Sequence, residues 1–135
     1  YDDLLGEVLE EIEARIGLAL KSGIKLEQLI IDPGLGFSKT TEQNLLLLKN
    51  CAAFHTLGLP VLLGPSRKSY IGEVTGRPVS QREWGTAAVV AIAVSKGIQI
   101  LRVHEVGFMR DVVRMVEAIR GEEYVGTFQM GKYKA

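Results

Sequence analysis

The sequence predicts an α/β fold in which about three parallel strands alternate with helices, and three observations support this prediction. Short apolar runs, each typical of a buried strand, recur at 29–31, 60–63 and 98–103. Longer segments with apolar residues at helical spacing lie before, between and after these runs. Proline and glycine follow the first two runs, which indicates short connections. Alternating elements with short connections imply parallel strands covered by helices.

Five helices are expected, and two of them have a recognisable start. The capping-box spacing of Thr40 and Gln43 precedes the second helix, and that of Ser80 and Glu83 precedes the fourth. The fourth helix is apolar on nearly every face, so we expect it to be buried on two sides. The five helices are expected at 4–20, 40–58, 68–76, 85–96 and 107–119.

The length of the chain limits how much of a larger fold it can hold. The chain has 135 residues, whereas a complete (β/α)8 barrel needs about 250. Three strands make a small sheet, since sheets usually have about 4–6. A small open α/β domain and one half of a barrel both fit. We expect one domain over 1–121 and a tail without periodicity over 122–135.

Composition and charge exclude several classes of protein. Lys and Arg together number 16, as do Asp and Glu, and this zero net charge argues against a partner that is nucleic acid or an anionic membrane. The longest apolar run is too short to span a membrane. The single cysteine, Cys51, excludes an internal disulfide and favours a cytoplasmic location. The first residues do not resemble a signal peptide, and the absence of an initiator Met suggests a processed chain or part of a longer protein.

Polar side chains follow each predicted strand. Asp32 follows the first, Arg67 and Lys68 follow the second, and Arg102 and His104 lie at the end of the third. Because parallel strands end at the same edge of a sheet, we expect these groups to share one rim, where the active sites of parallel α/β folds lie.

Each of these groups has a chemical and a purely structural interpretation. A buried Asp32 carboxylate would accept from a heterocycle with two adjacent N–H groups, although an Asp before Pro-Gly is also ordinary turn chemistry. Arg67 and Lys68 suit an anion, or form a solvated basic turn. Arg102 and His104 are two apart on a strand, so they face the same side and can hold a phosphate.

Other unusual residues are interpreted as structural. The histidine at position 55 lies within a helical pattern, and we expect a structural role for it. Met109 and Met115 are expected to be core residues, and Cys51 a small buried hydrophobic residue. Trp84, near the start of an apolar helix, is expected to have a packing role.

Three motifs, taken in order, resemble the C-terminal half of the dihydropteroate synthase family. They are Ile31-Asp32-Pro33-Gly34-Leu35-Gly36-Phe37, Gly64-Pro65-Ser66-Arg67-Lys68 and Arg102-Val103-His104. The intervening Gln43-Asn44-Leu45 and Gly85-Thr86-Ala87 also match the family pattern, and Leu35 is a mild departure. The resemblance covers residues 1–121 and implies the C-terminal half of a (β/α)8 TIM barrel.

The resemblance also implies an activity. Members of the family join 6-hydroxymethyl-7,8-dihydropterin diphosphate to p-aminobenzoate, giving 7,8-dihydropteroate and diphosphate in folate biosynthesis, and sulfonamides compete for the p-aminobenzoate site. By resemblance, the pterin is bound by Asp32, Phe37, Gly64, Lys68 and Arg102. The p-aminobenzoate would be bound by Arg67, Lys68 and Ser69, and the diphosphate by Arg102 and His104. The catalytic residues would be Lys68, Arg102 and His104.

The family's N-terminal half supplies further pterin ligands and the Asn that binds Mg²⁺. No metal ligand is therefore expected in this chain, and we expect the chain to be a poor enzyme by itself. The apolar inner faces of Ile30, Leu62 and Ile100 need a cover, so we expect a homodimer or association with the missing N-terminal half.

Two alternatives stay open at this point. A barrel of the methyltetrahydrofolate-binding methyltransferase type would share pterin recognition without needing the anion-binding residues. A non-catalytic fragment would contribute only structure or dimer contacts.

Overall fold

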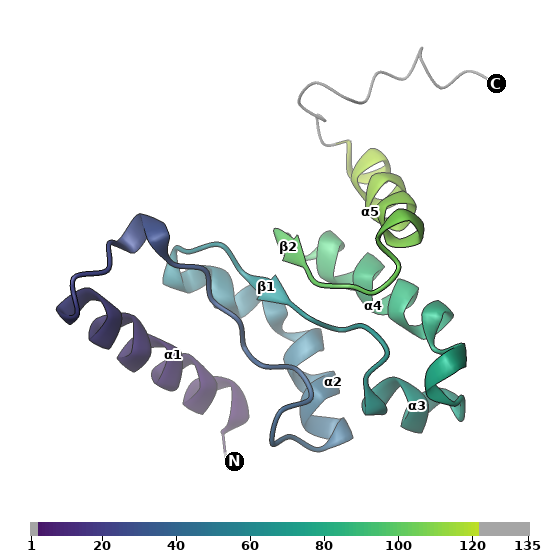
Figure 1. Cartoon of the computed structure of the whole chain (residues 1–135), viewed down its shortest axis with the longest axis horizontal. Helices are drawn as coiled ribbons and strands as arrows, with labels where there is room; N and C mark the ends of the chain where they lie inside the picture. Colours follow the sequence, from purple (N-terminus) through teal and green to yellow (C-terminus); the bar gives the residue numbers. More distant parts are fainter. Residues whose placement is uncertain (1–2, 122–135) are drawn as a thin grey trace.

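The computed structural model describes residues 3–121. Within this range helices and two very short strands alternate along the chain (Figure 1). The α-helices are α1 (Leu4–Lys21), α2 (Thr41–Lys49), α3 (Ser69–Thr75), α4 (Glu83–Ser95) and α5 (Val106–Arg120). The 3₁₀ helices are η1 (Leu26–Gln28), η2 (Cys51–Leu57) and η3 (Val79–Gln81), and the strands are β1 (Leu62–Leu63) and β2 (Ile100–Leu101). The predicted tail over 122–135 lies outside the described residues.

Three parallel segments lie side by side in chain order. Strand β1 pairs with β2, with Leu62 opposite Ile100, and an isolated parallel bridge joins Ile31 to Val61. The Leu62 N–H donates to the Ile31 carbonyl at 2.8 Å. The predicted first strand is thus reduced to one bridge, because Pro33 has no N–H to continue the ladder. The prediction of about three parallel strands is confirmed in this shortened form.

Alternate residues of these segments face opposite sides. Ile31, Val61 and Leu63 are buried, and in Figure 1 helices α2 and α4 lie behind the strands. Ile30, by contrast, is 55% exposed, since no described element covers the other face. The alternation therefore separates a helix-covered face from an open inner face.

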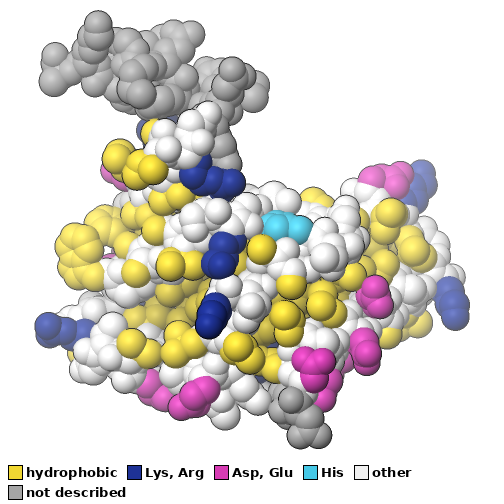
Figure 2. All heavy atoms as spheres, turned by 180° about the vertical axis from the view of Figure 1, so that it is seen from behind, with side chains coloured by type: hydrophobic (Ala, Val, Ile, Leu, Met, Phe, Trp, Pro, Cys, Tyr) yellow, Lys and Arg dark blue, Asp and Glu magenta, His cyan; other side chains and the backbone are white. Residues whose placement is uncertain are grey.

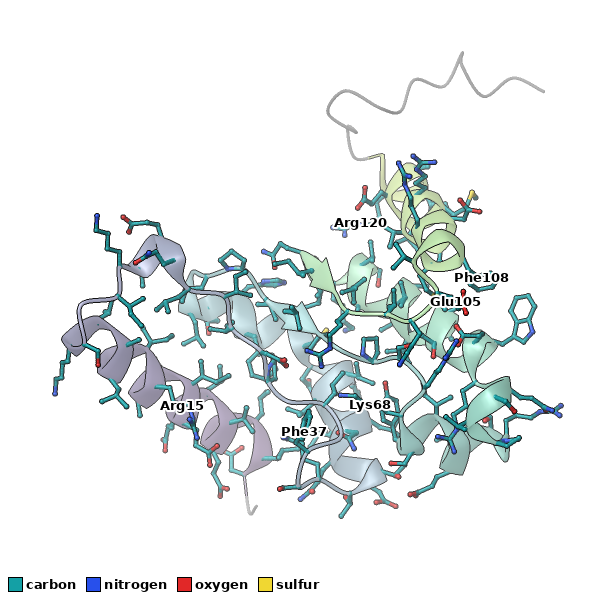
Figure 3. All side chains as sticks on the ribbon, viewed as in Figure 1. Arg15, Phe37, Lys68, Glu105, Phe108 and Arg120 are labelled. Carbon is teal, nitrogen blue, oxygen red and sulfur yellow. The ribbon has the colours of Figure 1, made fainter. Side chains whose placement is uncertain are left out.

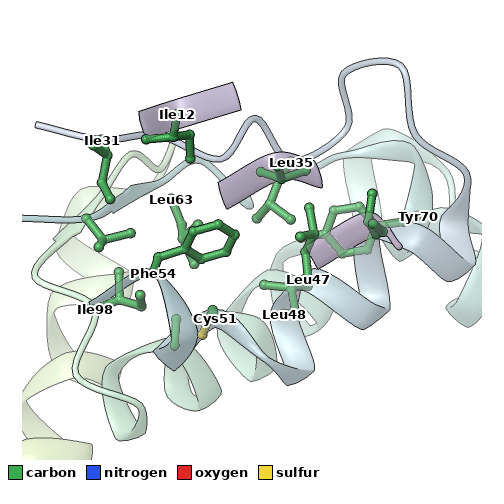
Figure 4. Close-up of a cluster of buried hydrophobic side chains, with 14 of the residues drawn as sticks. Ile12, Ile31, Leu35, Leu47, Leu48, Cys51, Phe54, Leu63, Tyr70 and Ile98 are labelled. Carbon is green, nitrogen blue, oxygen red and sulfur yellow. The ribbon is translucent and has the colours of Figure 1, made fainter. Parts of the chain in front are cut away.

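The main core lies between α1, the strands and the α2–η2 segment (Figure 4). Phe54 of η2 is fully buried at its centre, and Tyr70 of α3 closes one end. A second, smaller cluster joins α4 to α5 through Val90, Val94 and Met109. Both clusters tie helices to the strand ends and so hold the carboxyl ends of the strands in place.

Two helix starts differ in outcome. The Thr40–Gln43 capping box forms as predicted. The Ser80–Glu83 box does not, because Ser80 lies within η3, and Arg82, at the N-cap position of α4, makes no side-chain capping hydrogen bond. Glu83 is instead hydrogen-bonded to Arg67, which removes it from the role of a cap.

The predicted second helix is divided in two. It ends at Asn50, whose side-chain amide donates back to the Leu46 carbonyl at 2.9 Å, and a 3₁₀ helix continues to Leu57. The side chain competes with the backbone for that carbonyl, which favours a break in the helix.

Helix α4 packs on two sides, as predicted, but it keeps one exposed stripe. Ala93 lies in the main core cluster, and Val90 and Val94 pack against α5, while Ile92 is exposed. Between α2 and α4 lies an open apolar groove flanked by Lys49 and Lys96, and Figure 2 shows hydrophobic and basic side chains mixed on this rear face.

No helix within residues 3–121 is long and apolar enough to cross a membrane.

The structural interpretations of single residues have mixed outcomes. Cys51 and Met109 are buried as predicted, but Met115 is exposed. Trp84 is also exposed, although it has the packing contact that was expected. The Trp84 ring meets Phe108 edge to face, with 5.7 Å between ring centroids, on the surface between α4 and α5. His55 contacts the Lys96 carbonyl through Nε2 at 2.9 Å, which supports its structural role.

Replacement of the central core residue tests the packing. Phe54→Ala should lower the free energy of unfolding by about 3–5 kcal/mol, because it opens a cavity that the surrounding helices cannot fill. Leu18→Ala, at a position of α1 that is 66% exposed, is the matched control and should change it by less than about 0.5 kcal/mol. Urea denaturation followed by circular dichroism measures both, and equal losses would place the core elsewhere.

Candidate functional site

The carboxyl ends of the three parallel segments bring four predicted site residues together. Asp32, Gly64 and Arg102 follow the paired strand residues, and Lys68 reaches them from the loop after β1. The Arg102 N–H donates to the Leu63 carbonyl at 2.9 Å, which fixes the position of Arg102 beside Gly64. The predicted shared rim is therefore present.

Asp32 and Arg102 form an open ion pair. Arg102 Nη1 lies 3.9 Å from Asp32 Oδ2, and 38% of the Asp32 side chain is exposed. The prediction of a buried Asp32 carboxylate is wrong for this chain, because Asp32 is on the inner face, which no described element covers. Its other oxygen, Oδ1, accepts from the Gly34 N–H at 2.9 Å, which orients the carboxylate.

Gly64 leaves room for the Arg102 side chain. A Cβ built on Gly64 would lie 2.9 Å from Arg102 Cζ and 3.2 Å from Nε. The guanidinium therefore lies directly over the Gly64 backbone, and only glycine permits this approach without moving Arg102.

Lys68 is held against the loop after the first strand. Its ammonium donates to the Leu35 carbonyl and lies 4.9 Å from the centroid of the Phe37 ring (Figure 3). Burial, and then the charge of Arg102, lower the pKa of Lys68, while Asp32 acts in the opposite direction. Lys68 thus combines a cation, a ring contact and electrostatic coupling to both members of the ion pair.

The same loop is fixed by two residues that the sequence analysis did not select. Lys39 Nζ donates to the carbonyls of Gly34 and Phe37 at 3.0 and 3.1 Å, and burial lowers the pKa of Lys39. Asn44 is buried, and its Oδ1 accepts from the Gly36 N–H at 2.7 Å. The only sequence signal for Asn44 is its place in the Gln43-Asn44-Leu45 pattern.

Arg67 is directed toward α4 and the start of α5. Its Nε donates to Glu83 at 2.5 Å and its Nη2 to Glu105 at 3.1 Å, and the hydrogen bond with Glu83 raises the pKa of Arg67. The backbone of Arg67 has a positive φ of 59°. Thr86 Oγ1 accepts its N–H at 3.1 Å, and Arg82 donates to its carbonyl at 3.0 Å. These contacts hold a strained residue in one conformation.

Ser66 and His104 connect the ends of the second and third strands. Ser66 is buried, and its hydroxyl lies 2.7 Å from His104 Nδ1. Ser69, predicted from the resemblance to contact p-aminobenzoate, is exposed as the first residue of α3. The structure therefore brings Gly64 and Lys68 together around Asp32 and Arg102. His104 lies in an adjacent pair with Ser66, and Arg67 is turned away toward Glu83 and Glu105.

The described part of the chain does not fit a magnesium site. Residues 3–121 contain no group of three or more His, Cys, Asp or Glu side chains that could hold a metal ion. The rim carboxylate, Asp32, faces a guanidinium. The expectation that a magnesium ligand lies outside this chain stays a prediction.

Comparison with known protein families identifies the class to which this chain belongs. Residues 1–104 match the family described as pterin binding enzyme. The chain therefore belongs to the pterin binding enzymes.

Its relatives within that class are dihydropteroate synthases. The chain is 42% identical over 120 residues to the dihydropteroate synthase of Synechocystis sp., covering 88% of this chain and 42% of that protein. With the enzyme of Haemophilus influenzae it is 45% identical over 118 residues, covering 87% of this chain and 43% of that protein. The chain thus spans less than half the length of these relatives.

Solved structures give the same result for the fold. A Yersinia pestis dihydropteroate synthase in a sulfonamide drug complex superposes with a TM-score of 0.88 at 37% identity, covering 90% of this chain and 44% of that one. The Coxiella burnetii enzyme in complex with pteroic acid gives 0.84 at 37% identity, covering 87% and 43%. The predicted partial α/β barrel is confirmed.

The electrostatic coupling at the rim can be tested through Lys68. Arg102→Gln should raise the pKa of Lys68, because it removes a neighbouring positive charge, and Asp32→Asn should lower it further. Arg110→Gln, on the exposed surface of α5, is the control and should leave it unchanged. NMR titration of lysine labelled with ¹³C at Cε measures the shifts. The same direction of shift in both rim variants would contradict the coupling.

Proposed function

We propose that this chain supplies part of the active site of a dihydropteroate synthase, which condenses 6-hydroxymethyl-7,8-dihydropterin diphosphate with p-aminobenzoate in folate biosynthesis. The observation that carries the proposal is the meeting of Asp32 and Arg102, with Lys68 and His104 at the same strand ends. The Asp32 carboxylate can accept from the N–H groups of a heterocycle, and the cationic or N–H donors beside it can bind an anion. The rim therefore matches a ligand that carries a heterocycle at one end and an anionic group at the other.

Asp32 is the proposed pterin ligand. Since Oδ1 is oriented by the Gly34 N–H, the carboxylate has a fixed direction and further acceptor capacity toward adjacent N–H groups of a heterocycle. The Arg102 guanidinium lies close to Gly64 and its side chain is 59% exposed, so part of it would be available to stack on the ring. Phe37 and Lys68 would form the neighbouring wall.

Arg102 and His104 are the proposed ligands of the leaving diphosphate. In the reaction the bond between the pterin methylene carbon and the diphosphate oxygen breaks, and its electron pair leaves with the diphosphate. The amine nitrogen of p-aminobenzoate forms the new bond to carbon and loses a proton. Donors that are already in place stabilise the charge that develops on the leaving group, while Asp32 stabilises the positive charge on the pterin.

The p-aminobenzoate site would lie beside Lys68, with Arg67 and Ser69 at its border. Glu83 and Glu105 accept from two of the five N–H donors of Arg67, so its direct part in carboxylate binding would fall to the remaining N–H groups of Nη1 and Nη2. Lys68, whose lowered pKa reflects its partly buried position, is the stronger candidate for contact with this substrate.

The rest of the enzyme would complete the barrel. Ile30, Leu62 and Ile100 share the inner face, and the chain spans less than half of its relatives, so we propose that the remaining part of the barrel covers this face, with a homodimer as the alternative assembly. We also keep a cytoplasmic location and a magnesium ion as proposals. The ion would neutralise diphosphate charge, with its ligands outside this chain.

A methyltetrahydrofolate-binding methyltransferase is the alternative function. It shares pterin recognition, so Asp32 does not separate the two. Arg102 and His104 favour the synthase, because a substrate without diphosphate does not need two donors at the neighbouring strand end. A purely structural fragment would not need either ligand site.

The pterin assignment is tested by Asp32→Asn. The amide places a donor against donors, so pterin affinity should fall at least about tenfold, as expected for loss of a charged hydrogen bond. Isothermal titration calorimetry of the whole protein with 6-hydroxymethyl-7,8-dihydropterin measures the change. Asp111→Asn, on exposed α5, is the matched control. Equal affinity of the Asp32 variant and this control would exclude Asp32 as the pterin ligand.

The diphosphate assignment is tested by His104→Ala. This variant should bind inorganic diphosphate about tenfold more weakly, since it loses a donor to an anion, while free pterin binds as before. The two ligands are titrated separately against the same preparation. Equal losses for both ligands would give His104 a structural role.

A further inference from the structure

Ser66 makes two contacts with a single residue of the neighbouring strand end. Its Oγ accepts the backbone N–H of His104 at 3.3 Å and lies 2.7 Å from Nδ1 of the same imidazole. Ser66 is 7% exposed, whereas His104 is exposed, so the Nδ1 edge of the ring faces the protein. The buried hydroxyl is therefore placed to control both the position and the protonation pattern of the ring.

The hydrogen count favours one of the two neutral forms of His104. A hydroxyl has one proton to donate and two lone pairs to accept with. One lone pair already receives the His104 N–H. If Nδ1 carried the ring proton, the Ser66 proton would have no acceptor among the hydrogen bonds of the described residues. If Nδ1 carries no proton, it accepts the Ser66 hydroxyl proton, and both contacts between the two residues are satisfied hydrogen bonds.

We propose that Ser66 is a positioning residue that holds neutral His104 as the Nε2–H tautomer, with this N–H offered to an anion at the rim. The inference deepens the proposed function and rests on it for the identity of the anion, the diphosphate leaving group. The ring can donate to that anion without first being protonated, because its other nitrogen is occupied by the hydroxyl.

His55 provides a reference for the tautomer within the same chain. Its Nε2 lies 2.9 Å from the Lys96 carbonyl, which can only accept, so His55 must carry its proton on Nε2. The ring of His55 is on a different segment, η2, and makes this contact independently of Ser66. Both histidines should therefore show the same tautomer, for different reasons.

The test is a long-range ¹H–¹⁵N NMR spectrum of the histidine rings in the whole protein. The pH is raised until the ring ¹⁵N shifts no longer change with pH, which shows that both rings are neutral. His104 and His55 are assigned through His104→Gln and His55→Gln. The wild-type spectrum should show Nε2–H for both rings. Ser66→Ala should give a mixture of tautomers for His104 alone, and Ser66→Thr, which keeps the hydroxyl, should restore the single form.

Binding of inorganic diphosphate provides the second readout. Ser66→Ala should weaken it roughly two- to tenfold, as expected for the loss of one oriented hydrogen bond, and Ser66→Thr should recover it. An Nδ1–H tautomer for His104 in the wild-type protein would overturn the proposal even if both variants failed to fold. The tautomer does not depend on which reaction is catalysed, so the Nε2–H form without diphosphate binding would contradict the proposed function and leave the role of Ser66 in place.

Discussion

The parallel register of the three strand segments determines which side chains can meet. Val61 lies beside Ile31, and Leu62 lies opposite Ile100, so the residues that follow each segment end at one rim. Because side chains alternate along a strand, a shift of one residue would exchange the buried face with the inner face. Asp32 would then point into the helical layer, where a charge without a partner is costly. Burial of Val61 and Leu63 therefore fixes the register and, with it, the Asp32–Arg102 pair.

Buried polar side chains fix the loops that extend from this register. The buried polar residues of the described part are Asn44, Ser66 and Thr86. Each accepts a hydrogen bond from a backbone N–H of the rim: Gly36 for Asn44, His104 for Ser66, and Arg67 for Thr86. A buried acceptor without a donor is unfavourable, so each contact restricts one loop to the conformation that satisfies it. The site is thus held by its polar supports as well as by the hydrophobic core.

The sequence predicted the features that depend on local residue patterns, namely the strand ends and the polar residues that follow them. Apolar runs that end at proline or glycine located the strand ends, and the rim chemistry followed because parallel strands share an edge. The exposure of Asp32 on the inner face could not be predicted from the adjacent residues in the sequence. It depends on which other elements cover that face of the sheet. The exposure of Met115 was missed for a similar reason, because periodicity defines the faces of a helix without showing what packs on each.

Contacts between distant residues account for most of what the sequence did not predict. Glu83 resembled a capping residue, yet it binds Arg67, which is 16 residues away. Thr86 reaches Arg67 across 19 residues, and Ser66 reaches His104 across 38. These pairs depend on how α4 and β2 pack beside the loop after β1, so local spacing carries no direct signal for them.

Turnover is the most direct test of the function proposed for this rim. The whole protein would be incubated with 6-hydroxymethyl-7,8-dihydropterin diphosphate and p-aminobenzoate, with the pterin product separated by chromatography and diphosphate release measured in parallel. A dihydropteroate synthase forms 7,8-dihydropteroate and releases diphosphate in equal amounts. A folded protein that binds methyltetrahydrofolate tightly and forms no dihydropteroate would contradict the proposed function and favour the methyltransferase alternative.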